Sequence, residues 1–158
     1  MVIPAFDFAT WGTRVVAYII DSVLVAAVMG VIYLVLGSVF GLLGGLSRGA
    51  EGVMSGGCCF FLVLFPIASI VVGVYNRVIL VAQRGYSIGM GVMKIKVVDG
   101  NGQLLTQSAA ILRLLAQIGL SLLPFGAFID LLWPLWDPAR QTLHDKAVSS
   151  YVINNPRA

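Results

Sequence analysis

The stretch GTRVVAYIIDSVLVAAVMG (residues 12–30) has the composition of a membrane-spanning helix, yet it contains two charged side chains. Asp21 follows Arg14 by close to two helical turns, so both lie on one face, with Asp21 roughly 10 Å deeper. A carboxylate at that depth costs about 2.5–3.5 kcal/mol on insertion scales unless it is neutral, paired or in contact with water. We therefore expect Asp21 to face the interior of a helix bundle and to meet a polar or basic side chain there.

The whole chain has the composition of an integral membrane protein. Of its 158 residues 59% are hydrophobic and 11% are charged, and the mean hydropathy is +0.96, whereas about a quarter of the residues in soluble domains are charged. This length excludes a large catalytic domain. The sequence has no phosphate loop, nucleophile elbow, CxxC or HExxH motif and only one histidine, so we expect no enzyme activity, no cofactor and no metal site.

Two hydrophobic runs predict two membrane-spanning helices. The first covers about residues 15–43 and the second about 58–82, and each exceeds the ~20 residues that cross a hydrocarbon core. A glycine-rich connection, GGLSRGAEGVMSGG (44–57), is expected between them. Within the second run, Pro66 predicts a kink.

Residues 83–107 are too polar and too rich in glycine to span, so we expect them at the membrane surface. Residues 93–98 roughly alternate apolar and charged side chains, and DGNG (99–102) is a strong turn signal, which together predict a short hairpin. Residues 149–153 also have β-type composition. We expect them to pair with residues 94–98, because each segment is too short to be stable alone.

Residues 108–136 could form one further span or a helical hairpin that turns at Leu123–Gly126. The positive-inside rule favours the hairpin, because it returns the basic tail (137–158) to the side of the basic N-terminal and middle segments. The predicted fold is an all-α membrane protein with two transmembrane helices, a helical hairpin and a small β element on the cytoplasmic face. It forms a single domain over residues 1–158, with both termini in the cytoplasm.

Several charged residues converge near the inner side of the membrane in this arrangement. Asp130 comes at about the depth of Asp21, and Arg113 is the first candidate partner for Asp21, ahead of Arg77 and Arg14. The expected buried charge network consists of Arg14, Asp21, Arg113 and Asp130. The sequence leaves open whether this network locks helix packing or binds ions. For Asp130 alone, a position within snorkelling reach of the interface or a capping role in the second arm of the hairpin is favoured over ion coordination.

Three separated motifs resemble the RDD family of bacterial membrane proteins, which is named for one arginine and two aspartates. They are TRVVAYIIDSVLV (13–25), GYSIGMGVMKIKVVDGNGQLLTQSAAILR (85–113) and RQTLHDKAVSSYVI (140–153). By this resemblance the family motif residues are Arg14, Asp21, Gly85, Gly89, His144 and Asp145. Ser87 and Met90 stand where the family's middle motif has threonine and lysine, and Ser149-Ser150 stands where its tail has Gly-Thr. His144 itself is expected to be a hydrogen-bonding residue at the membrane interface.

The resemblance implies a small helical domain of the bacterial inner membrane and a role in transport, and some members are associated with cation/proton antiport. We expect transport of ions or small solutes by a homo-oligomer or as part of a larger transporter, because a few short segments rarely enclose a pathway. The alternative is a non-catalytic accessory or assembly subunit of a larger membrane complex. Membrane lipids are expected partners and nucleic acids are not, since a net charge of +3 is usual for the cytoplasmic loops of a membrane protein.

Overall fold

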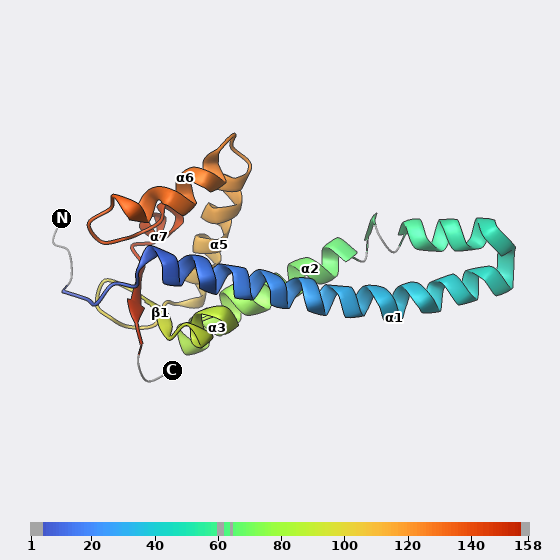
Figure 1. The fold of residues 1–158 in the computed structure, drawn as a ribbon, viewed down its shortest axis with the longest axis horizontal. Coiled ribbons are helices and arrows are strands. Elements are labelled where there is room, and N and C mark those ends of the chain that lie inside the picture. Colours follow the sequence, from blue (N-terminus) through green and yellow to red (C-terminus); the bar gives the residue numbers. More distant parts are fainter. Residues whose placement is uncertain (1–4, 60–61, 64, 156–158) are drawn as a thin grey trace. The chain divides into compact units, whose positions relative to one another are not determined.

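The computed structural model describes residues 5–59, 62–63 and 65–155 (Figure 1). These residues form two compact units. The first unit contains the described residues up to Asp21 and from Tyr75 onward, and the second contains those from Ser22 to Val74. Every residue that the sequence analysis placed in a charge network or family motif belongs to the first unit. That unit is therefore the one in which a functional site is built.

The second unit contains helix α1 (Trp11–Cys59) from Ser22 onward and the whole of α2 (Phe65–Val74). Helix α1 continues through residues 44–57, so the glycine-rich connection predicted there, which lies between the two apolar segments, is helical. Glycine lowers helix stability by about 1 kcal/mol relative to alanine, but this stretch contains no proline that would stop a helix. Among the described residues, two helical segments are long and apolar enough to cross a membrane, Trp11–Leu43 and Phe65–Arg84.

The described part of the second segment begins at Phe65, and residues 62 and 63 before it are π-helical. The predicted start near residue 58 and the kink predicted at Pro66 border residues 60, 61 and 64, which lie outside the described residues, so both stay predictions. A π-helical turn, η2 (Tyr75–Ile79), follows α2 and precedes α3 (Leu80–Arg84).

The first unit continues with a series of short elements that surround the beginning of α1. In chain order they are α4 (Ile88–Val92), β1 (Ile95–Val98), α5 (Gln107–Ser121), α6 (Gly126–Leu132), the 3-10 turn η3 (Trp133–Leu135), α7 (Leu143–Ala147) and β2 (Tyr151–Asn154). Helix α5 packs against α6, α7 and η2. The indole Nε1 of Trp11 donates a 2.9 Å hydrogen bond to the Leu131 carbonyl oxygen, which links the start of α1 to α6.

The two strands confirm the predicted pairing of the middle and tail segments. They are antiparallel, in a register that runs from Ile95 opposite Asn154 to Val98 opposite Tyr151, and Phe8 adds a single bridge to Ile153. A local hairpin at DGNG is wrong, although the turn itself forms. The Asp99 carboxylate accepts hydrogen bonds from the backbone N–H groups of Asn101 and Gln103. Residues 103–106 then lead into α5.

Residues 108–136 form two helices and not one span, as the hairpin prediction requires. Helix α5 ends at Ser121 and α6 begins at Gly126, and between them Phe125 adopts the left-handed conformation with φ 62°. A Cβ atom on Gly126 would lie 2.1 Å from the Leu120 carbonyl oxygen. The close approach of the two helices therefore requires glycine at this turn.

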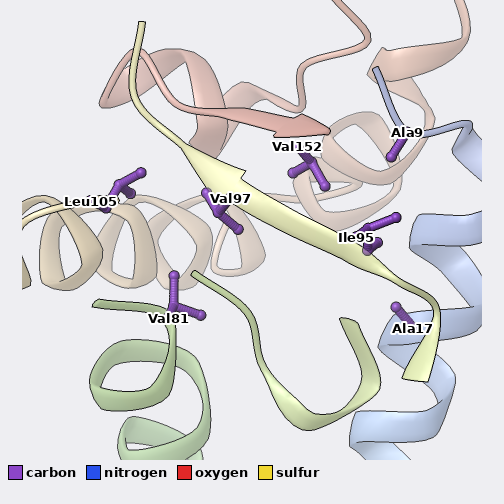
Figure 2. Packing of buried hydrophobic residues seen from close by; sticks show 7 residues of the cluster. All are labelled: Ala9, Ala17, Val81, Ile95, Val97, Leu105 and Val152. Carbon is purple, nitrogen blue, oxygen red and sulfur yellow. The ribbon is translucent and has the colours of Figure 1, made fainter. Parts of the chain in front are cut away.

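A small apolar core holds these elements together (Figure 2). Strand β1 points Ile95 and Val97 to one face, as alternate residues of a strand do. They meet five buried side chains from other parts of the unit: Ala9 of the N-terminal segment, Ala17 of α1, Val81 of α3, Leu105 of the loop before α5, and Val152 of β2. The core thus fixes α1 and the tail strand beside each other.

Candidate functional site: two polar clusters around a cavity

Asp145, in the first turn of α7, is the centre of a buried ionic cluster. Its side chain has no exposed surface. Arg14 of α1 donates from Nη1 to Oδ2 over 2.9 Å, and Arg113 of α5 donates from Nε and Nη2 to Oδ1 over 2.8 and 2.7 Å. One carboxylate therefore joins three helices. Because partners on two sides compensate its burial, the carboxylate acts as a fixed anchor for the surrounding helices.

The local sequence around Asp145 explains why this carboxylate is held so firmly. Thr142 and Asp145 form a capping box, in which the Thr142 hydroxyl accepts from the Asp145 N–H and the carboxylate accepts from the Thr142 N–H. The Ser150 hydroxyl donates to Oδ1 over 3.2 Å. Ser150 thus keeps the hydroxyl of the family's threonine, whereas Ser149 adopts φ 52°, a conformation that suits the family's glycine better.

Asp130 and His144 extend this cluster. His144 is buried, and its Nδ1 lies 2.6 Å from Asp130 Oδ2, while its backbone N–H donates to Asp130 Oδ1 over 3.0 Å. Its Nε2 lies 3.7 Å from Asp145 Oδ1, so the ring stands between two carboxylates. Asp130 therefore caps α7 from a neighbouring helix, and the predicted cap of its own hairpin arm is wrong. We call Arg14, Arg113, Asp130, His144 and Asp145 the Asp145 cluster.

Asp21 belongs to a second polar cluster, and its partners are not the predicted ones. Its buried carboxylate accepts from Asn76 Nδ2 at 2.9 Å, from Ser87 Oγ at 2.5 Å and from the Gly89 N–H at 2.7 Å. The expected contact with polar side chains of other segments is confirmed. Arg113 as its first partner is wrong, because Arg113 is directed to Asp145. We call Asp21, Asn76, Ser87 and Gly89 the Asp21 cluster.

Gly89 and Asn76 show how tightly the Asp21 cluster is assembled. A Cβ atom on Gly89 would lie 2.2 Å from the Ala17 carbonyl oxygen and 3.0 Å from Asp21 Cγ, so only glycine lets α4 approach α1. Asn76 donates to Asp21 and accepts from the Ile88 N–H, which uses both ends of its amide. Asn76 and the role of Ser87 were not predicted from the sequence. An amide within a hydrophobic run was the signal that could have identified Asn76.

Gly85, the remaining motif residue, ends helix α3. It has φ 85°, and its N–H donates to the Val81 carbonyl oxygen, as glycine commonly does at a helix C-terminus. A Cβ atom there would lie 2.7 Å from Leu104 Cδ2. Its role is to turn the chain toward α4, away from both clusters.

Both clusters contribute to the lining of one cavity of about 260 Å³ within the first unit. Most of its lining is apolar, including Val15, Val81 and Phe128. Arg77 of η2 also lines it, donating from Nη1 to Gln117 Oε1 over 3.2 Å, with its guanidinium carbon 5.1 Å from the centre of the Tyr18 ring. Met90, at the position of the family's lysine, lines the same cavity. Among the side chains that the structure describes, no group of three or more His, Cys, Asp or Glu residues could hold a metal ion.

The separation of the clusters predicts that substitutions in them are energetically independent. Asp21→Asn and Arg113→Gln should change the free energy of unfolding additively, within about 0.5 kcal/mol, since the two side chains have different partners. Asp21→Asn and Ser87→Ala, which weaken the acceptor and remove the donor of one hydrogen bond, should instead show a coupling of about 1 kcal/mol or more. Detergent-solubilised variants melted in a double-mutant cycle provide the measurement. Coupling of the Asp21 and Arg113 changes would instead indicate a single network.

The electrostatics of Asp145 predict a dependence of stability on pH. Burial raises the pKa of its carboxyl, but the positive charges of Arg113, His144 and Arg14 outweigh this, so the pKa lies well below its ordinary value of 3.8. A lowered folded pKa means that the stabilisation is complete above about pH 5 and declines as the pH falls below 3.8.

Arg113→Gln removes one of these charges, so its deficit in melting temperature relative to the unchanged protein should be largest near neutral pH. The deficit should narrow as the pH falls through the pKa of Asp145 in the folded variant, because a protonated carboxyl no longer pairs with Arg113 in either protein. Melting curves from pH 7 to pH 2 measure it. A deficit that stays constant over this range would show that the pair contributes little electrostatic stabilisation.

Comparison with known proteins adds one finding. A sequence model described as the RDD family matches residues 8–149. This range contains all residues of both clusters and every residue of the cavity lining except Val152. No curated protein and no solved structure matches the chain.

Proposed function

Since the chain belongs to the RDD family, a family of membrane proteins, we propose that it binds a small solute in the cavity of its first unit and takes part in moving that solute across the membrane. The cavity is the observation that carries the proposal. Small-molecule sites are concave and mostly apolar, with a few convergent polar groups, and a cavity of about 260 Å³ lined by two polar clusters matches that description at the size of a small solute.

The hydrogen bonds of the carboxylates favour a solute over a bare cation. Asp21 already accepts from three protein donors, and Asp130 accepts from the backbone and ring of His144. A cation such as Ca²⁺ needs six or more oxygen ligands, and these oxygens are engaged. We therefore assign Asp21 a structural role, in which it holds α4 and η2 against α1.

The same proposal places the protein in the bacterial inner membrane, with both termini and the middle segment in the cytoplasm. This orientation is supported by contacts among the N-terminal, middle and C-terminal segments: β1 pairs with β2, and Phe8 bridges to Ile153. Segments joined in this way share one side of a membrane. Asn155→Cys, in a protein whose Cys58 and Cys59 are serine, should react with an impermeant maleimide only after cell lysis. Labelling of intact cells would contradict this orientation.

Transport is tested with purified protein in liposomes. Solid-supported membrane currents are recorded for a panel of monovalent cations, amino acids and organic anions, with protein-free liposomes as the control. We expect at least one solute to give a saturable, protein-dependent current, carried by a homo-oligomer. Currents equal to the control for the whole panel, together with stoichiometric co-purification of an unrelated membrane complex in mild detergent, would instead support an accessory subunit.

A further inference from the structure

The arginines that line the cavity have more hydrogen-bond donors than the surrounding protein uses. A guanidinium carries five N–H groups. Within the described part of the chain, Arg77 has one hydrogen bond, to Gln117, and no acidic side chain forms an ion pair with it. It is therefore a cation on the cavity wall without a protein anion to neutralise it.

Arg14 adds a second unused donor. Its Nη1 and Nη2 donate to Asp145 and to the Val152 carbonyl oxygen. Its Nε is one of two buried side-chain nitrogens without a hydrogen-bond partner in the described residues. A buried donor that is left without a partner costs about 1–3 kcal/mol, so the protein leaves part of the hydrogen-bonding capacity of this guanidinium unused.

The acidic residues of the cavity, unlike the arginines, have their hydrogen-bonding groups occupied by the protein. Asp21 accepts three hydrogen bonds, and Asp130 accepts two. Asp145 accepts from two arginines, Ser150 and the Thr142 N–H. The carboxylates are thus satisfied by the protein while donors remain at the arginines, and a complementary ligand must bring acceptors.

We propose that the cavity binds a small molecule with one oxyanion group, a carboxylate or a phosphate, on a mainly apolar body, and that the oxyanion contacts the guanidinium of Arg77. A guanidinium presents its donors as a planar fork that matches two oxygens of either group. The body lies against the apolar lining, which includes Val81, Phe128 and Leu131. A cavity of about 260 Å³ has room for a ring-sized body, since an engineered cavity of about 150 Å³ already holds benzene. This inference rests on the proposed solute-binding function and names the class of solute.

Four probes of similar shape test the charge preference: benzoate, phenyl phosphate, benzamide and benzamidine. Each is titrated calorimetrically into the full-length protein in detergent, with a protein-free micelle blank. We expect saturable binding of benzoate, of phenyl phosphate or of both, at least tenfold tighter than that of neutral benzamide and cationic benzamidine. The two anions distinguish a carboxylate site from a phosphate site. Equal affinity for benzamide, tighter binding of benzamidine, or no saturable binding of either anion overturns the inference.

Two arginines from the same stretch of helix provide a matched pair of variants. Arg77→Gln should weaken binding of the preferred anion at least tenfold, whereas Arg84→Gln, at an exposed position outside the cavity lining, should change it less than twofold. If Arg77→Gln does not fold by its melting curve, Arg77→Lys keeps the charge but loses the fork. It should bind several-fold more weakly, and unchanged affinity overturns the assignment to Arg77.

The binding and transport experiments fail independently. Anion binding without any protein-dependent current would keep this inference and remove the transport role. A saturable current carried by a cation or an amino acid, with no binding of either anion, would remove the inference and keep the role.

Discussion

Asp145→Asn should prevent the chain from accumulating as a folded protein, with a loss of about 3–5 kcal/mol in the free energy of unfolding. The substitution keeps the size of the side chain but removes the only negative charge that Arg14 and Arg113 contact as an ion pair in the described residues. Two guanidinium groups would then be largely buried and close together without a counter-charge. A loss of this size is comparable to the whole stability of a small domain.

The matched control is Asp7→Asn. Asp7 is exposed and accepts a hydrogen bond from the Asn154 side chain, so the same chemical change there should lower stability by less than about 1 kcal/mol. Yield of monodisperse protein after detergent extraction and the melting temperature are the measurements for both variants. An Asp145→Asn variant that purifies and melts like the unchanged protein would contradict the central place of this carboxylate.

Gly89→Ala is expected to have the next largest effect, a loss of about 3 kcal/mol or more. The new methyl group would lie 2.2 Å from a backbone oxygen of α1, which cannot rotate away as a side chain would. Overpacking alone costs about 1–3 kcal/mol, and moving α4 outward also breaks the hydrogen bond from the Gly89 N–H to Asp21.

Gly119→Ala provides the comparison for this variant. Gly119 lies within α5, and a Cβ atom there meets nothing within 4 Å. Alanine should therefore raise stability by about 0.5–1 kcal/mol through its better helix propensity. Thermal or denaturant unfolding of both variants compares them directly. If Gly89→Ala were as stable as Gly119→Ala, the close contact between α4 and α1 would not exist.

The sequence predicted the interior position of Asp21 because an unpaired carboxylate deep in hydrocarbon is costly, and its depth follows from residue spacing. It could not predict which arginine meets which aspartate, because that depends on how helices pack laterally. Asp145 was placed in a polar tail, and its complete burial results from α1 and α5 covering α7. Its capping box with Thr142 was nevertheless present in the sequence as Thr-x-x-Asp.

In the middle of the chain, too, the sequence predicted local structure but not every pairing between segments. The β composition of residues 94–98 and 149–153 identified two strands that need partners, and pairing them was correct because each is too short alone. The local hairpin was wrong because a turn signal specifies a reversal of the chain but not what pairs with the strand before it. The helical turn at Leu123–Gly126 was correctly placed, since proline and glycine act there through local backbone geometry.

The central claim is that the polar clusters support a cavity in which the solute binds. Ala127 lines this cavity from α6, and Ala127→Trp would fill it without removing any charge or hydrogen bond of the clusters. Leu122→Trp, at a position that is 81% exposed, adds a similar ring outside the cavity and serves as the control. The most direct test is the solid-supported membrane current of both variants for the solute that gives the largest protein-dependent current. We expect Ala127→Trp to melt within a few degrees of the unchanged protein and to lose at least nine-tenths of the current, while Leu122→Trp keeps it. A full current in a folded Ala127→Trp protein would contradict the account.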